Sequence, residues 1–109
     1  MMTINLHDAL FHSYELECGT SSTATFRVSY YPDEQSSTRI DATIRIANAS
    51  SIATNIDLER LAIHKVFGDV SDWSPSQGRG LTYIHLAGGT ISVFGDEPVL
   101  SVATPVVEE

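Results

Sequence analysis

Two segments in the first half of the chain alternate strictly between apolar and polar residues: 23–31 (TATFRVSYY) and 39–47 (RIDATIRIA). A period of two is typical of a strand with one buried and one solvated face. The polar, turn-forming residues 32–38 (PDEQSST) separate them, which predicts an antiparallel hairpin. Closing this loop brings the apolar residues opposite one another; the predicted pairs are Tyr30–Ile40, Val28–Ala42, Phe26–Ile44 and Ala24–Ile46.

A second hairpin is predicted at residues 82–95 (TYIHLAGGTISVFG), where the alternation continues on both sides of two glycines. A two-residue turn with positive φ at both positions suits Gly88–Gly89. The predicted pairs are Leu86–Ile91, Ile84–Val93, His85–Ser92 and Tyr83–Phe94. The first two pairs form a core face. Tyr83 and Phe94 would form an aromatic pair on the reverse face, which either another element covers or a partner contacts.

A short helix is expected at residues 57–67, between the two hairpins. Asp57 can cap its N-terminus and Gly68 can take the left-handed conformation after its end. The apolar stripe consists of Leu58, Leu61, Ala62 and Val66.

The whole chain, residues 1–109, is expected to form a single globular domain, mainly β. We expect an antiparallel sheet or partly closed sandwich of about six to seven strands, with the helix covering part of the apolar face. Leu10–Cys18 is the predicted first strand and Val99–Val102 the last, followed by a frayed tail at residues 103–109.

The chain is strongly acidic: 14 carboxylates against six lysines and arginines give a net charge of −8. Such a surface repels phosphates, which disfavours nucleic acids and anionic membranes as partners. It attracts a basic protein and accelerates the encounter. The alternative is that the charge only keeps the protein soluble.

The sequence favours a cytoplasmic protein. No apolar stretch approaches the roughly 20 residues that cross a bilayer, and the N-terminal MMTINLHD does not resemble a secretion signal. Cys18 is the only cysteine, which fits a reducing compartment. We expect it to be a small buried hydrophobe or a passive thiol.

His7 and Asp8, in the opening stretch LHDALFHSYEL, are the first candidates for chemistry. In an extended backbone their side chains diverge, so we expect no direct contact. The favoured interpretation is structural: Asp8 fixes the start of the first strand and His7 is hydrogen-bonded near a sheet edge, with ligand contact or catalysis as alternatives. The four histidines are dispersed, so no metal site or other cofactor is expected.

A nucleophilic set could be assembled from Ser92, His85 and Asp96, because Ser92 and His85 are predicted neighbours. The sequence has no nucleophile elbow and no glycine-rich oxyanion loop beside them. A surface hydrogen bond is therefore favoured, and no enzyme activity is expected. A small hydrolase using His7, Asp8 or His85 remains the alternative.

Trp73 lies beside a proline in SDWSPS, a segment expected to be a loop. It either plugs one end of the core or anchors a partner. The nearby Asp69 and Asp72 would suit an interface with a basic surface.

Several short motifs point to a family: His-Asp-Ala at His7–Ala9, Asn55–Ile56, and Gly-x-Ile at Gly89–Ile91 within the last hairpin. Over about Leu6 to Val102 the chain resembles bacterial polymorphic-toxin immunity proteins of the family immunity protein fifty, and related uncharacterised small domains. The resemblance implies a cytoplasmic antitoxin that blocks a cognate toxin by binding, without catalysis or a cofactor.

We therefore expect a non-enzymatic binding protein, an immunity protein that neutralises a basic toxin through its acidic surface. The predicted contact residues are Asp69, Asp72, Trp73, Asp96 and Glu97. The alternative is a self-associating structural domain, a homodimer formed through the Tyr83–Phe94 face or an exposed strand edge.

Overall fold

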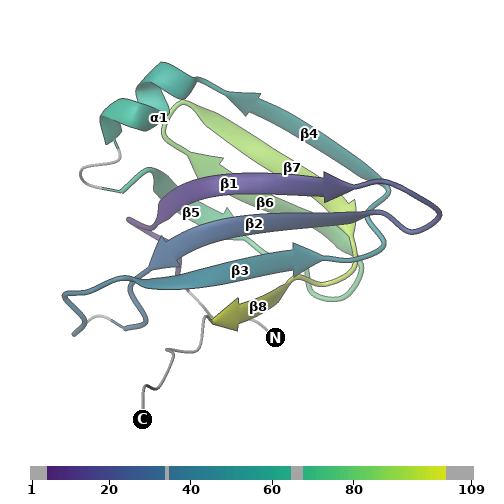
Figure 1. Ribbon diagram of the computed structural model, residues 1–109, viewed down its shortest axis with the longest axis horizontal. Coiled ribbons are helices and arrows are strands. Elements are labelled where there is room, and N and C mark those ends of the chain that lie inside the picture. Colours follow the sequence, from purple (N-terminus) through teal and green to yellow (C-terminus); the bar gives the residue numbers. More distant parts are fainter. Residues whose placement is uncertain (1–4, 34, 65–67, 103–109) are drawn as a thin grey trace, which may run out of the picture.

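Two four-stranded antiparallel sheets pack face to face in the computed structural model (Figure 1), which describes residues 5–33, 35–64 and 68–102. The first sheet has the order β1-β2-β3-β8 and the second β4-β7-β6-β5. The strands are β1 (Leu10–Glu17), β2 (Thr23–Tyr30), β3 (Ile40–Ile46), β4 (Ser51–Ile56), β5 (Val70–Ser74), β6 (Gly80–Leu86), β7 (Gly89–Gly95) and β8 (Val99–Val102). The mainly β prediction is confirmed, with eight strands among the described residues in place of six to seven.

The first hairpin has the predicted register. Tyr30 pairs with Ile40 and Phe26 with Ile44 in the β2–β3 ladder. β1 pairs with β2 and β8 pairs with β3, which confirms the predicted first and last strands. Residues 103–109, predicted to be a frayed tail, lie outside the described residues.

The second hairpin has the predicted faces but a different register. Leu86 pairs with Gly89, and Tyr83 pairs with Ser92, not with Phe94. The turn is therefore Ala87–Gly88, and Gly88 has φ 84°. A shift of two residues leaves every side chain on its face, so the apolar pattern alone could not detect it.

Two strands were not predicted. In β4 the inward positions are Ile52, Thr54 and Ile56, and this weak alternation did not indicate a strand. In β5 a bulge between Val70 and Asp72 breaks the alternation, so two buried residues, Val70 and Trp73, lie three positions apart. Trp73 is therefore in a strand, not in a loop.

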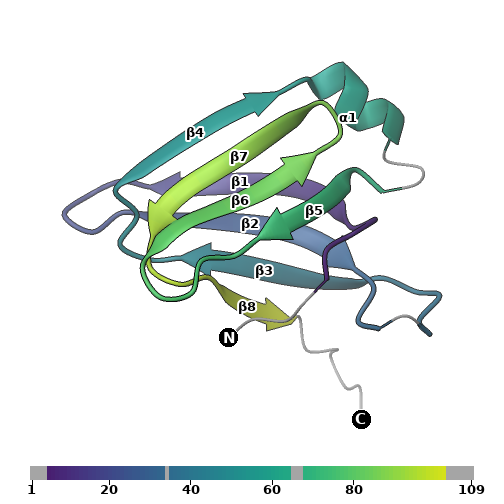
Figure 2. The same cartoon turned by 180° about the vertical axis from the view of Figure 1, so that it is seen from behind.

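The helix α1 (Leu58–His64) is capped as predicted, since Oδ1 of Asp57 accepts a hydrogen bond of 3.1 Å from N–H of Arg60. It lies at one end of the sandwich (Figures 1 and 2), and the second sheet, not the helix, covers the apolar face. Of the predicted stripe Leu61 is buried, whereas Leu58 is 72% exposed, and Val66 lies outside the described residues. In the part of the chain that the structure describes, no helix could span a membrane.

The core lies between the two sheets and consists mainly of their inward-facing residues. Its largest fully buried apolar side chains are Phe26, Leu6, Ile44, Ile46, Ile84, Ile91, Val28, Val70 and Val93. The sheets are offset: in Figures 1 and 2, β4 extends beyond β1 at one side and β8 extends beyond β5 at the other. The offset leaves the inner face of β4 without a strand of the first sheet over it.

Candidate functional site

His7 and Asp8 contact each other, contrary to the prediction. Asp8 has φ 65°, so the backbone is not extended, and Nε2 of His7 lies 3.6 Å from Oδ1 of Asp8. Nδ1 of His7 lies 2.8 Å from the carbonyl oxygen of Ser71 on β5. That hydrogen bond, and then the Asp8 carboxylate, raise the pKa of His7 above 6.5. The imidazole thus lies at a sheet edge, as predicted.

The predicted contact residues around β5 are largely turned inward. Trp73 is 6% exposed and belongs to the core, and Asp69 is 1% exposed. Oδ1 of Asp69 accepts a hydrogen bond of 2.6 Å from N–H of Phe11, which fixes the start of β1. The exposed Asp72 accepts a 2.8 Å hydrogen bond from N–H of Trp73. Asp69 and Trp73 therefore offer almost no surface to a partner.

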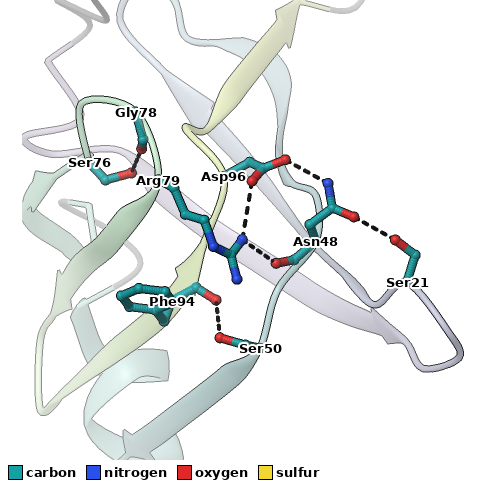
Figure 3. A network of polar contacts seen from close by, with 8 residues as sticks. All are labelled: Ser21, Asn48, Ser50, Ser76, Gly78, Arg79, Phe94 and Asp96. Atoms are coloured by element: carbon teal, nitrogen blue, oxygen red, sulfur yellow. Dashed lines mark hydrogen bonds and ion pairs between the residues drawn. The ribbon is translucent and has the colours of Figure 1, made fainter.

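Asp96 belongs to a polar network between loops at one end of the sandwich (Figure 3). Its carboxylate accepts hydrogen bonds from Nδ2 of Asn48 (2.7 Å) and Nη1 of Arg79 (3.1 Å). The bond from Asn48, and then the guanidinium of Arg79, lower the pKa of Asp96 below its ordinary 3.8. Asn48 in turn accepts a hydrogen bond from the Ser21 hydroxyl. This carboxylate therefore connects loops of its own chain.

Glu97 is engaged in a similar way, because its Oε1 accepts a 2.6 Å hydrogen bond from N–H of Gly78. The loop before β6 is closed by a second hydrogen bond, from the Ser76 hydroxyl to the carbonyl of Gly78 (2.8 Å, Figure 3). Glu97 therefore holds the β5–β6 connection.

Ser92, His85 and Asp96 do not form a nucleophilic set. His85 lies opposite Thr90, with Nδ1 3.5 Å from its hydroxyl, and Ser92 lies opposite Tyr83. The Asp96 carboxylate is bound in the loop network. The predicted hydrogen bond between His85 and Ser92 depended on the wrong register.

A different serine, histidine and aspartate do meet, on the outer face of the first sheet. The Ser29 hydroxyl donates a 2.5 Å hydrogen bond to Oδ1 of Asp41 and lies 2.7 Å from Nε2 of His12. Because the single hydroxyl proton of Ser29 points to Asp41, His12 must donate to Ser29 and cannot act as its base. The β1 bulge next to His12 made this contact unpredictable from simple alternation. The three residues connect β1, β2 and β3.

Cys18 is an exposed free thiol, so the prediction of a buried hydrophobe is wrong and the passive thiol remains. Among the described residues, no three His, Cys, Asp or Glu side chains gather as possible metal ligands.

The outer face of the second sheet exposes Leu81, Tyr83 and Phe94. Both rings have partners within the chain. The Tyr83 ring is stacked on His85, with centroids 6.1 Å apart, and the Arg79 guanidinium lies 5.2 Å from the Phe94 ring centroid.

Apolar side chains that face inward are exposed along one side of the sandwich, between β1 and β4. We call this surface the β1–β4 edge; it consists of Tyr14, Leu16, Ile52, Thr54 and Ile56. All five face inward, since they pair with buried residues of β2 or lie on the inner side of β4 beside β7. Even so, Tyr14 is 38% and Leu16 is 44% exposed. The inner faces of these two strands are thus open to solvent.

A hollow of about 160 Å³ lies at the end of the β1–β4 edge. Its walls come from β1, β2, β4 and the loops beside them, and apolar atoms form most of their exposed surface: Leu16, Glu17, Cys18, Ser22, Thr23, Ala49, Ser50, Ser51 and Ile52. Strand β1 presents acid beside this apolar surface, because Glu15 and Glu17 alternate with Tyr14 and Leu16.

The two glutamates are exposed and form no hydrogen bond or ion pair with a described residue. Their alternation with Tyr14 and Leu16 was the available signal for a surface strand. It did not show which apolar residues remain uncovered, because that depends on the offset of the sheets.

Comparisons of the chain with protein-family models, with curated proteins and with solved structures found no match.

Proposed function

We propose that this protein is a non-enzymatic binding protein that neutralises a basic protein partner, as the immunity proteins it resembles neutralise toxins. The supporting observation is the β1–β4 edge, an uncovered apolar surface beside the unpaired carboxylates of Glu15 and Glu17. Uncovered apolar surface of this kind marks interaction sites. Carboxylates at its rim steer and select a cationic partner.

The distribution of acid favours this surface over the predicted contact residues. Asp72, Asp96 and Glu97 already accept hydrogen bonds within the chain. Using them would break those bonds. Glu15 and Glu17 are bound to no described residue, so a lysine or arginine can pair with them without that loss.

We further propose that the protein acts in the cytoplasm and that its partner is neither a nucleic acid nor a membrane. A net charge of −8 repels both phosphate backbones and anionic lipids. The exposed thiol of Cys18 would persist in a reducing compartment.

The test is affinity capture from the cell that makes this protein. Three baits are compared: the native protein, Glu15→Gln/Glu17→Gln, and the control Asp33→Asn/Asp72→Asn, which removes the same charge elsewhere. We expect the native and control baits to retain a basic protein that the Glu15→Gln/Glu17→Gln bait does not retain. This protein should be released at about 1 M salt, where the Debye length is about 3 Å. If no protein distinguishes the baits, the proposal is wrong.

The neutralising role has its own test. The captured partner is expressed alone and together with this protein, and growth is followed. We expect the partner alone to arrest growth and co-expression to restore it. A captured partner that leaves growth unaffected would show binding without an immunity role.

A second candidate is self-association through Leu81, Tyr83 and Phe94 on the outer face of the second sheet. Light scattering across a concentration series tests it. A dimer that Leu81→Lys dissociates supports it, and a monomer at every concentration excludes it.

A further inference from the structure

We propose that the β1–β4 edge binds an extended segment of the partner, which pairs with β1 as an additional strand of the first sheet. This inference rests on the proposed function and specifies how the partner is held. β1 is the outermost strand of its sheet, so from Ser13 to Glu17 one side of its backbone is available to a further strand, whereas near its start N–H of Phe11 is already bonded to Asp69. A strand added there occupies the space over β4 that the offset leaves open (Figures 1 and 2).

The inner face of the added strand would complete the sandwich. Its inward side chains continue the row begun by Tyr14 and Leu16 and pack on Ile52 and Ile56, which already contact the core. β4 has six residues, so a segment of about six residues, at about 3.3 Å per residue, matches its length.

Two of the other sheet edges, those of β5 and β8, are less suited to an added strand. The β5 edge is occupied by the chain itself, since N–H of Asp8 donates a 2.9 Å hydrogen bond to the carbonyl of Val70 and His7 bonds to Ser71. β8 has four residues. Within β1 the bulge lies near its start, and from Ser13 to Glu17 the pairing with β2 is regular.

Strand β1 also dictates the chemistry of the segment. Side chains opposite Tyr14 and Leu16 face inward and must be apolar. Side chains opposite Glu15 and Glu17 face outward and must be lysine or arginine, because opposite charges stabilise a cross-strand pair. The segment therefore alternates between apolar and basic residues.

The same glutamates disfavour a second copy of this chain as the occupant. Antiparallel pairing of two β1 strands would bring Glu15 and Glu17 of each copy close to those of the other. Like charges directly opposite are destabilising. Charge complementarity thus selects a basic partner segment.

The probe is a capped octapeptide of alternating valine and lysine. The control peptide has the same composition in two blocks, four valines followed by four lysines. We expect the alternating peptide to bind about tenfold more tightly. Bound peptide should slow amide exchange at alternate residues of Ser13–Glu17 and shift the methyl resonances of Leu16, Ile52 and Ile56.

Two variants locate the binding. Leu16→Lys places a charge in the inner row, and Leu81→Lys makes the same change at an equally exposed leucine on the other sheet. We expect at least about a tenfold loss in the first and none in the second. Glu15→Gln/Glu17→Gln leaves the inner row intact and should also weaken binding of the alternating peptide.

Binding that leaves the β1 amides unprotected, or equal loss in Leu16→Lys and Leu81→Lys, would overturn the inference. A β1-mediated dimer that the peptide dissociates would make a second copy the occupant and also overturn it. If affinity capture yields a basic partner that the Glu15→Gln/Glu17→Gln bait fails to retain, but its binding leaves the β1 amides unprotected, the proposed function stands and this binding mode fails.

Discussion

The amide of Asn48 binds the carboxylate of Asp96 at 2.7 Å, joining the β3–β4 connection to the β7–β8 connection. Asn48 itself has φ 51°, a conformation that asparagine tolerates better than most residues. Asp96 therefore contributes to folding through its ionised form, and its pKa lies below the ordinary 3.8.

The first prediction is that the contribution of Asp96 to stability decreases at acidic pH. A carboxyl whose pKa is lower in the folded state stabilises fully above its unfolded pKa, and the contribution is lost as pH falls through the folded pKa. The unfolding free energy of the native protein should therefore be higher than that of Asp96→Asn. The difference between the two should be largest at pH 6 and should shrink below pH 3.8. Urea unfolding at both ends of this range measures it. Asn48→Gly keeps the positive φ but removes the hydrogen bond to Asp96, so in this background Asp96→Asn should cost less unfolding free energy than it does in the native protein. If the cost of Asp96→Asn in the native protein were the same at both pH values, Asp96 would not stabilise the fold through its ionised form.

The second prediction concerns His7, whose shift has the opposite sign. The raised pKa means that its contribution is full below pH 6.5 and is lost as pH rises through the folded value. An NMR titration of the imidazole should give a midpoint above 6.5. Asp8→Asn, which tolerates the φ of 65°, should lower the midpoint. A native midpoint at or below 6.5 would mean that the hydrogen bond to Ser71 does not form.

The third prediction compares two leucines of one helix. Leu61 is 8% exposed and Leu58 is 72% exposed, although the helical stripe predicted both to be buried. Leu61→Ala should lower the unfolding free energy by about 2 kcal/mol, because it removes core contacts. Leu58→Ala should change it by less than about 0.5 kcal/mol. Urea midpoints measure both, and similar losses would mean that the helix is rotated.

Much of the fold followed from alternation where one face of a strand is fully buried. Phe26 and Ile44 belong to such strands, and their register was predicted correctly. Alternation could not distinguish registers two residues apart in the β6–β7 hairpin. In that hairpin Gly89 lies against β4, where an added Cβ would clash with the carbonyl oxygen of Asn55, and the alternation of β6 and β7 carries no information about this contact.

The site was less predictable than the fold. Tyr14 and Leu16 have the pattern of core residues, and only the offset of the two sheets exposes them. Asp96 was predicted to be a contact residue because of its charge, but the loops that bind it are distant in sequence. The charge of an isolated residue does not show whether its own chain already uses it.

The fourth prediction tests the position of β4, which supplies one side of the β1–β4 edge. In Gly89→Ala the new methyl would meet backbone atoms of Asn55 and Ile56, which cannot move without loosening the β4–β7 ladder. We expect a loss of about 1–3 kcal/mol and faster amide exchange in β4. Gly19→Ala is the control, because apart from its chain neighbours no described residue has an atom within 4 Å of the new methyl; it should change stability by less than about 0.5 kcal/mol. Since β4 supplies Ile52 and Ile56, Gly89→Ala should also weaken binding of the alternating peptide while Glu15 and Glu17 remain. Unchanged stability with protected β4 amides would mean that β4 does not pair with β7 in this register.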